Sequence, residues 1–197
     1  QSDIGPDGHG KRGGFLPPVP LPRRMWAGVR LTWHAPLRVG DSVQRTSRIE
    51  SVSHKSGRTG DLVFVGMKHE ITSAQGLAIS EEHDIVYRAA AQPGDPVPPP
   101  ATAPHAAVWS REIVPDDVLL FRYSALTFNG HRIHYDLDYV TKEEGYPGLI
   151  VHGPLIATLL LDGVRRARPD AVVKRFSFRA LARTFHIDDF AVHGRIT

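Results

Sequence analysis

The chain has 197 residues, of which 41% are hydrophobic, so it can bury a sizeable core as one large domain or two small ones. Its 24 basic and 21 acidic residues give a net charge of +3, and the basic residues are scattered along the chain, which disfavours a dedicated nucleic-acid binder. The absence of cysteine excludes a disulfide scaffold and a thiolate nucleophile, and the cytoplasm is the default expectation for its location.

The longest apolar run, GLIVHGPLIATLLLDGV, is broken by histidine, proline and aspartate and is too short to cross a bilayer. No membrane segment is therefore expected. The chain begins without methionine or a signal peptide and ends abruptly on VHGRIT. We expect it to be a piece of a longer protein.

The first half of the chain predicts an arm followed by strands. Residues 1–24 are rich in Gly and Pro and have no periodicity, which indicates an extended, irregular arm. Four alternating segments then predict strands: MWAGVRLTWHA (25–35), SVQRTSRIESVSH (42–54), DLVFVGMKHEIT (61–72) and AISEEHDIVYRA (78–89). The short breaks between them favour an antiparallel meander. A cluster of prolines next predicts a linker over residues 91–110.

The second half predicts two helices and two strands. PDDVLLFRYSALT has proline in a first-turn position and acidic residues that favour the helix dipole, so we expect a helix from Asp116 to Ser124. Pro154 can begin a second helix, which is apolar nearly all round as far as Val164 and must be enclosed by other structure. VVKRFSFRALA (172–182) and DDFAVHGRI (188–196) predict strands.

A buried helix enclosed by a curled antiparallel sheet is the α+β arrangement called a hotdog fold. RLTWHAPLRVGDSV and RFSFRALARTFHIDDF share an aromatic residue, a basic or small pair and an acidic turn, which indicates an internal repeat. We therefore expect a double hotdog, with the arm over 1–24, a degenerate N-terminal repeat over 25–90, the linker over 91–110 and a catalytic repeat over 111–197. The first repeat lacks an apolar helix and the second lacks a closing strand, which fits a shortened chain.

The segment FNGHRIHYD (128–136) carries more chemistry than a turn requires. His134 has an ordinary pKa of about 6.5, so it can take and return a proton near neutrality. Asn129 can donate and accept hydrogen bonds but cannot act as a base. Together these two side chains can orient a water molecule and remove its proton.

Two other interpretations of this segment stay open. Asn-Gly is typical of a two-residue hairpin turn, which would leave both histidines on the surface. A metal site of His131, His134 and Asp136 is disfavoured, because no helix presents the two histidines on one face and no second cluster of ligands follows. In an extended loop, His131 would point away from His134.

A second candidate element is LIVHGPLIA (149–157), where the chain enters the apolar helix. The first-turn N–H groups of such a helix are unpaired and carry the positive end of its dipole, so Gly153, and with it Leu155, can hold an oxyanion. The alternative is that Gly-Pro merely begins a helix. His152 fits a capping or packing role as well as a catalytic one.

The combination of YSALTFNGHRIHYD with GLIVHGPLIATLLL resembles the hydratase motif of MaoC-like enoyl-CoA hydratases. It is more similar to the type-2 hydroxyacyl-thioester dehydratases and to the mesaconyl-C4-CoA or itaconyl-CoA hydratases. The resemblance implies that Tyr123 is the aromatic residue of the motif, Asn129 its acid or amide, His134 its histidine and Gly153 its oxyanion-hole glycine. The arm segment GPDGHGKRGGFLPPVPLPRRMWAG also resembles members that act on short dicarboxylic thioesters.

The resemblance implies syn addition of water across a 2-enoyl thioester, or its reverse, with no metal or redox cofactor. General hydratases of the family carry Asp where this chain has Asn129, so His134 must transfer the proton, as in the type-2 branch. Candidate substrate-binding residues are Tyr123, His152, Tyr146 and Arg132. The phosphates of an acyl-CoA would meet scattered basic residues, with RRAR (165–168) and the Lys-Arg pair at 174 and 175 as candidates.

Three rival functions remain at this point. The first is a 3-hydroxyacyl-thioester dehydratase of fatty-acid synthesis. The second is a thioesterase, for which Asp136 would have to supply the carboxylate. The third is a non-catalytic acyl-thioester-binding protein. For assembly we expect a homodimer or an internally paired double hotdog.

Overall fold

The computed structural model of the chain describes residues 3–57, 60–90 and 107–196, and these residues form two compact units. The sheet unit contains the described residues of Arg12–Pro98 and Val172–Leu181. The helical unit contains those of Gln1–Lys11, Pro99–Ala171 and Ala182–Thr197. Most of the predicted linker, residues 91–106, lies outside the described residues. Each unit is therefore assembled from segments that are distant in sequence.

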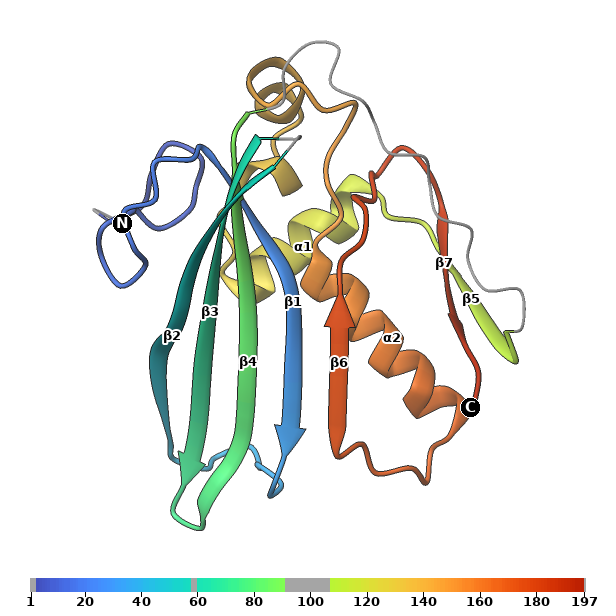
Figure 1. Cartoon of the computed structure of the whole chain (residues 1–197). Helices are drawn as coiled ribbons and strands as arrows, with labels where there is room; N and C mark the ends of the chain where they lie inside the picture. Colours follow the sequence, from blue (N-terminus) through green and yellow to red (C-terminus); the bar gives the residue numbers. More distant parts are fainter. Residues whose placement is uncertain (1–2, 58–59, 91–106, 197) are drawn as a thin grey trace. The chain divides into compact units, whose positions relative to one another are not determined.

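The sheet unit is a five-stranded antiparallel sheet in the order β2-β3-β4-β1-β6 (Figure 1). Its strands are β1 Arg23–Trp33, β2 Val43–Gly57, β3 Gly60–Ser73, β4 Gly76–Arg88 and β6 Arg175–Arg179. The four strands predicted in the first half are all present. The pairing of β2 with β3 and of β3 with β4 makes these strands a meander, as predicted, but β1 pairs with β4 and not with β2. The connection from β1 to β2 is long enough for the chain to pass from one side of the meander to the other.

One core cluster belongs to the sheet unit. Residues 12–22 of the predicted arm lie on the sheet and supply Val19 to this cluster, beside Val65, Ile85 and Tyr87. Arg12 fixes the segment by donating hydrogen bonds to the carbonyls of Val19 and Pro22. The sheet is therefore covered on part of one face by its own N-terminal segment.

The short strand β6 joins the far edge of the sheet. The sequence predicts a strand over 172–182, but only Arg175–Arg179 pairs with β1. Its Phe178 ring stacks on Trp26, with ring centroids 5.2 Å apart. A strand from the predicted C-terminal repeat thus completes a sheet built mainly from the predicted N-terminal repeat.

The helical unit contains both predicted helices, α1 Asp117–Thr127 and α2 Gly153–Ala167, each a few residues longer than predicted. Asp116 caps α1 by accepting the N–H of Leu119 at 2.7 Å. Between the helices lie a 3₁₀ turn, η1 Arg132–His134, and a π-helical turn, η2 Tyr139–Glu143, which the sequence did not predict. Leu120 and Leu155 are among the buried residues of the core that the helices and these turns share.

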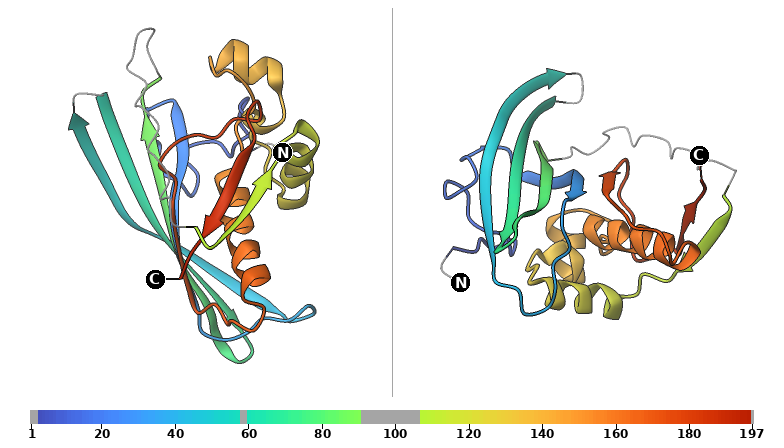
Figure 2. Two further views of the ribbon diagram at one scale, coloured as in Figure 1. Left: turned by 90° about the vertical axis from the view of Figure 1, so that its right-hand side faces the viewer. Right: turned by 90° about the horizontal axis from the view of Figure 1, so that it is seen from below.

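Two strands complete the helical unit. The predicted strand over 188–196 is β7 Phe190–Gly194, and it pairs with an unpredicted strand, β5 Trp109–Ile113. Figure 2 shows this pair lying along α2. The indole ring of Trp109 lies directly over Gly163 and Gly194, where a Cβ atom would collide with it. Two glycines therefore make room for the tryptophan.

None of the described helices has the length and continuous apolar character needed to span a membrane.

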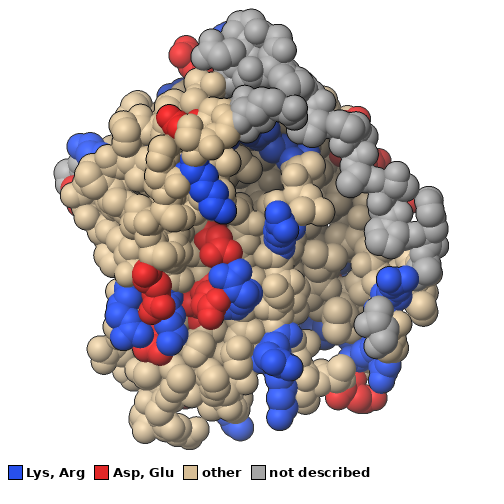
Figure 3. All heavy atoms as spheres, in the orientation of Figure 1, with Lys and Arg blue, Asp and Glu red and all other residues tan. Residues whose placement is uncertain are grey.

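Charges on the face drawn in Figure 3 are of both signs, and several basic side chains stand beside acidic ones. In the sheet unit, for example, Arg30 pairs with Glu82 at 2.6 Å and with Asp84 at 2.8 Å. This distribution agrees with the scattered positive charge of the sequence.

Candidate active site

The segment after α1 is not a hairpin. Phe128 ends the helix in the left-handed conformation, with φ of 56°. The side-chain oxygen of Asn129 then accepts the N–H of His131 at 3.1 Å, which leads the chain into η1. His131 and His134 are each only 8% exposed. The interpretation as a turn with surface histidines is therefore wrong. The loop is not extended but turns at η1, so the condition under which His131 would point elsewhere is not met.

His134 is held in one tautomer. Its Nδ1 lies 2.6 Å from the carbonyl oxygen of Ile150, and because a carbonyl can only accept, Nδ1 carries the hydrogen. The other ring nitrogen, Nε2, therefore keeps its lone pair when the ring is neutral. Burial and the nearby charge of His9 lower the pKa of His134 to about 4, although the bond to Ile150 acts in the opposite direction. The side chain is a neutral base at pH 7.

His152 lies against this base. Its ring stacks on His134 with centroids 3.7 Å apart and planes 18° apart, and it is fully buried. Its Nε2 shares a hydrogen bond of 2.8 Å with the hydroxyl of Ser124, and the Tyr123 ring meets it edge-on at 4.9 Å. Burial and the neighbouring His134 lower the pKa of His152 to about 3. It occupies the N-cap position of α2 without a side-chain capping bond, so capping is not its role.

The start of α2 is tied to the loop that carries the base. The N–H of Ile150 donates to the carbonyl of Ile133 at 3.0 Å, while the carbonyl of Ile150 receives the His134 ring N–H. Gly153 and Pro154 then form the first turn of the helix. Since first-turn N–H groups have no acceptor within a helix, the N–H of Gly153, the residue after His152, has no acceptor within α2 and has the helix dipole behind it.

Arg132 and Asp136 are engaged within the protein. The guanidinium of Arg132 donates to Asp136 at 3.0 Å and to the carbonyl of Pro6 at 3.2 Å, and it lies 4.2 Å from the centre of the Tyr139 ring. Asp136 also accepts the N–H of Tyr139, and this bond and Arg132 lower the pKa of its carboxyl. The pair fastens the loop, and Asp136 is not grouped with the two histidines as a metal site would require.

The remaining sequence candidates lie in other surroundings. The Tyr146 ring is 6.1 Å from Phe185, and the guanidinium of Arg183 lies over it at 4.9 Å. The arginines at 165 and 166 in the candidate phosphate-binding stretch both form ion pairs with Asp162, at 3.1 and 2.6 Å. The sequence candidates that come together are thus the rings of Tyr123, His134 and His152, with Gly153 adjacent in the chain.

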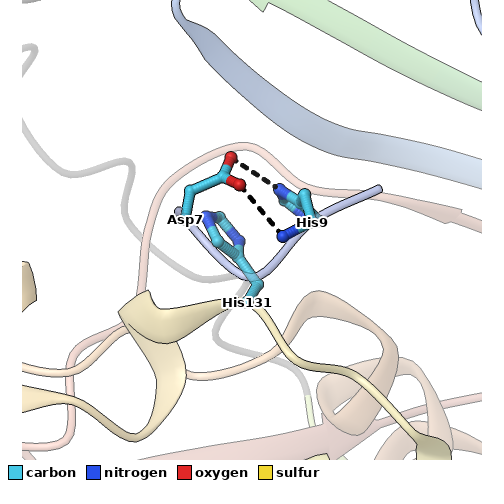
Figure 4. Close-up of side chains that lie close together, drawn as sticks. All are labelled: Asp7, His9 and His131. Atoms are coloured by element: carbon cyan, nitrogen blue, oxygen red, sulfur yellow. Dashed lines mark hydrogen bonds and ion pairs between the residues drawn. The ribbon is translucent and has the colours of Figure 1, made fainter. Parts of the chain in front are cut away.

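The sequence did not predict the group formed by Asp7, His9 and His131, which lie close together (Figure 4). The N–H of His9 donates to one carboxylate oxygen of Asp7 at 3.0 Å, and its ring Nδ1 lies 3.5 Å from the other. The ring of His9 lies against that of His131 with centroids 3.7 Å apart and planes tilted by 32°, and His131 meets His134 edge-on at 5.5 Å. The only signal in the sequence was the pairing of Asp and His between glycines in GPDGHG, within the irregular arm.

Solved structures similar to this chain include proteins described as MaoC-like dehydratases. HtdX of Mycobacterium tuberculosis is 24% identical, with a TM-score of 0.61 over 82% of this chain and 62% of that one. A MaoC-like dehydratase is 17% identical, with a TM-score of 0.67 over 88% and 66%. A protein of M. tuberculosis described as having a double hotdog fold is 16% identical, with a TM-score of 0.54 over 84% and 60%. The fold is therefore that of MaoC-like dehydratases, a hotdog type with an antiparallel sheet.

Sequence comparison gives a consistent result. Mesaconyl-C(4)-CoA hydratase of Chloroflexus aurantiacus is 49% identical over 199 residues, which cover 99% of this chain and 69% of that protein. The mitochondrial hydroxyacyl-thioester dehydratase type 2 of Schizosaccharomyces pombe is 29% identical over 191 residues, which cover 85% of this chain and 63% of that protein. The profile of the family named hydroxyacyl-thioester dehydratase type 2 matches residues 1–186. The chain belongs to that family, as its hydratase motif predicted.

Proposed function

We propose that this chain is a hydro-lyase that adds water reversibly across the double bond of a 2-enoyl thioester, with mesaconyl-C4-CoA or a similar short dicarboxylic acyl-CoA as the substrate. The identity of 49% to a mesaconyl-C(4)-CoA hydratase supports the substrate class. The match over residues 1–186 to a dehydratase family supports the reaction type. The same comparisons favour this function over the rivals that the sequence left open.

The observation that carries the proposal is the tautomer of His134. A general base must offer a lone pair to the water it deprotonates, and the bond from Nδ1 to Ile150 leaves that lone pair on Nε2. The lowered pKa keeps Nε2 free of a proton at neutral pH. The stacked His152 excludes water from one face of the ring, which contributes to that lowering.

In the proposed mechanism, Nε2 of His134 takes a proton from water as the water oxygen attacks the β-carbon. Electron density moves to the thioester carbonyl oxygen, which the N–H of Gly153 stabilises at the start of α2. The protonated Nε2 then returns its proton to the α-carbon, which gives syn addition. Asn129 uses its oxygen to hold the loop, so its amide N–H₂ is the part that positions the water or the thioester.

The double hotdog with a degenerate N-terminal repeat is part of this proposal. Two features support it: the sheet unit contains no helix among its described residues, and every candidate catalytic residue lies in the helical unit. The boundaries at residues 24, 90 and 110 stay predictions. A homodimer, or internal pairing of the two repeats, is the assembly we propose.

The thioesterase alternative has weaker support. It requires a carboxylate that can attack or activate water at the thioester carbon, whereas Asp136 accepts hydrogen bonds from Arg132 and from the N–H of Tyr139. A non-catalytic binding protein would not need a buried histidine fixed in the tautomer of a base. Neither alternative accounts for His134 as simply as hydration does.

A substrate panel tests the proposal. The chain is incubated with mesaconyl-C4-CoA, itaconyl-CoA and crotonyl-CoA, and the loss of the conjugated thioester absorbance is followed together with the release of free thiol. We expect absorbance loss without thiol release, fastest with a dicarboxylic substrate. Release of thiol would favour the thioesterase, and binding without turnover would favour the non-catalytic protein.

A further inference from the structure

The N-terminal segment docks on the loop that carries the proposed base. The backbone N–H of Arg132 donates to the carbonyl of Asp7 at 2.9 Å, and its guanidinium donates to the carbonyl of Pro6. Gly8 lies with φ of +84° so close to Gly130 that a Cβ atom would overlap the Gly130 carbonyl oxygen. Glycine is therefore required at residue 8 both for its conformation and for the close approach of the two backbones.

This docking places the imidazole of His9 against the ring of His131, which in turn contacts the ring of His134. The centroids of His9 and His131 are 3.7 Å apart, and those of His131 and His134 are 5.5 Å apart. Asp7 holds His9 through both its backbone N–H and its ring, and the bond from the His9 side chain lowers the pKa of the Asp7 carboxyl well below its usual range. A carboxylate so placed orients the His9 ring.

A metal is the first alternative for this group, since its three ligand atoms lie within 4.8 Å of one another. The ring geometry disfavours it. Nitrogen lone pairs lie in the plane of the imidazole ring, and the rings of His9 and His131 are tilted by 32° with their centroids only 3.7 Å apart. Two rings held this close together, one against the other, do not favour the spread-out tetrahedral ligands of a metal centre. Two imidazole N–H donors beside a proton-transfer base suit an anion better.

The chemistry of the proposed substrate supplies such an anion close to the base. In mesaconyl-C4-CoA the β-carbon, which water attacks, also bears the free carboxylate. Reacting atoms in a productive complex lie about 3–3.5 Å apart, so the β-carbon must lie close to the water held by His134. The carboxylate is bonded to this same carbon, so it too must lie close to His134, whose ring is 5.5 Å from that of His131.

We propose that His9 and His131, with Asp7 orienting His9, form the subsite for the carboxylate on the β-carbon of a dicarboxylic enoyl thioester. This inference rests on the proposed hydratase function and assigns its substrate specificity to the docked arm. Arg132, which the sequence suggested as a substrate contact, instead holds the arm in place. The subsite distinguishes substrates by their free carboxylate, and His134 remains the base for every substrate.

The test compares substrates that differ in this carboxylate. His9→Gln replaces the imidazole with a neutral amide, and Gly8→Ala displaces the arm while keeping its histidine. We expect either change to lower kcat/KM about 10- to 150-fold for mesaconyl-C4-CoA, the usual effect of losing a charge-assisted hydrogen bond. For crotonyl-CoA, which lacks the carboxylate, kcat/KM should stay within about twofold of the unmodified chain. His193→Gln, an exposed histidine of β7, is the matched control.

Calorimetric binding of succinyl-CoA and butyryl-CoA, which cannot be hydrated, separates this inference from the hydratase function. His9→Gln should weaken succinyl-CoA binding and leave butyryl-CoA binding unchanged, even if the chain hydrates nothing. Equal losses on both substrates would assign His9 a purely structural role and overturn the inference. Unchanged kinetics and binding would also overturn it, as would zinc binding to the unmodified chain that His9→Gln abolishes.

Discussion

Protonation of His134 is the event that we expect to limit hydration on the acidic side of neutrality. The structure lowers the pKa of this residue to about 4, chiefly because the ring is buried. A pKa of about 4 leaves roughly 90% of the ring neutral at pH 5, whereas an ordinary histidine with a pKa of about 6.5 would be roughly 3% neutral. Because only the neutral form accepts a proton from water, the rising limb of kcat/KM should lie near pH 4, and activity at pH 5 should approach its plateau.

The assay is kcat/KM for mesaconyl-C4-CoA between pH 3.5 and 8, with circular dichroism at each pH to confirm that the chain stays folded. A carboxylate can also titrate near pH 4, so Asp136→Asn serves as the control and should leave the midpoint of the limb in place. A limb centred near pH 6.5 would refute the buried, desolvated state of His134. If the limb disappears in Asp136→Asn, the proton-transfer group would be the carboxylate of Asp136 and not the imidazole of His134.

Three further substitutions probe the geometry. Gly153→Ala adds a methyl group beside the proposed carbonyl position. We expect kcat for hydration to fall about 10²–10³-fold, which corresponds to about 2.7–4 kcal/mol of lost transition-state stabilisation, the usual effect of losing one oxyanion donor. Asn129→Asp can still accept the N–H of His131, so the fold should persist, but the added charge should raise the pKa of His134 and shift the acidic limb of the pH profile upward. Gly194→Ala forces a methyl group into the Trp109 ring, and the free energy of unfolding in urea should fall by about 1–3 kcal/mol.

Each of these expectations can fail in a distinct way. If Gly153→Ala changes only the melting temperature, the residue is simply the start of a helix. If Asn129→Asp and Asn129→Ala both hydrate the substrate like the unmodified chain at every pH, the amide has no part in the site. Gly57→Ala, where a Cβ atom meets nothing within 4 Å, is the matched control for Gly194→Ala, and equal effects of the two would contradict the packing described for Trp109.

Local sequence patterns were sufficient for most elements of the fold. Sequence alternation identified β1 to β4 because each is long, and in β3 and β4 it corresponds to an alternation of more and less buried residues. The same patterns missed β5, which has only five residues and one buried side chain, Ile113. The same patterns could not predict that β1 lies beside β4. Strand order depends on the path of the connections between strands, which periodicity does not reveal.

The candidate site was predictable where its residues are close in sequence to recognisable elements. His134 and Gly153 could be placed from the loop after one helix and the first turn of the next. The contribution of Asp7 and His9 could not, because it depends on the backbone contact between Gly8 and Gly130, two positions far apart in sequence. The inward position of His131 also depended on a 3₁₀ turn that no sequence pattern indicated.

The most direct test of the account is the hydration of mesaconyl-C4-CoA by the unmodified chain and by His134→Ala, followed as loss of the enoyl-thioester absorbance. If Nε2 of His134 is the base, kcat should fall about 10²–10⁴-fold, the usual contribution of a positioned acid–base group. Some stability should also be lost, because the buried carbonyl of Ile150 loses its donor. A folded His134→Ala chain that hydrates mesaconyl-C4-CoA at the unmodified rate would contradict the account.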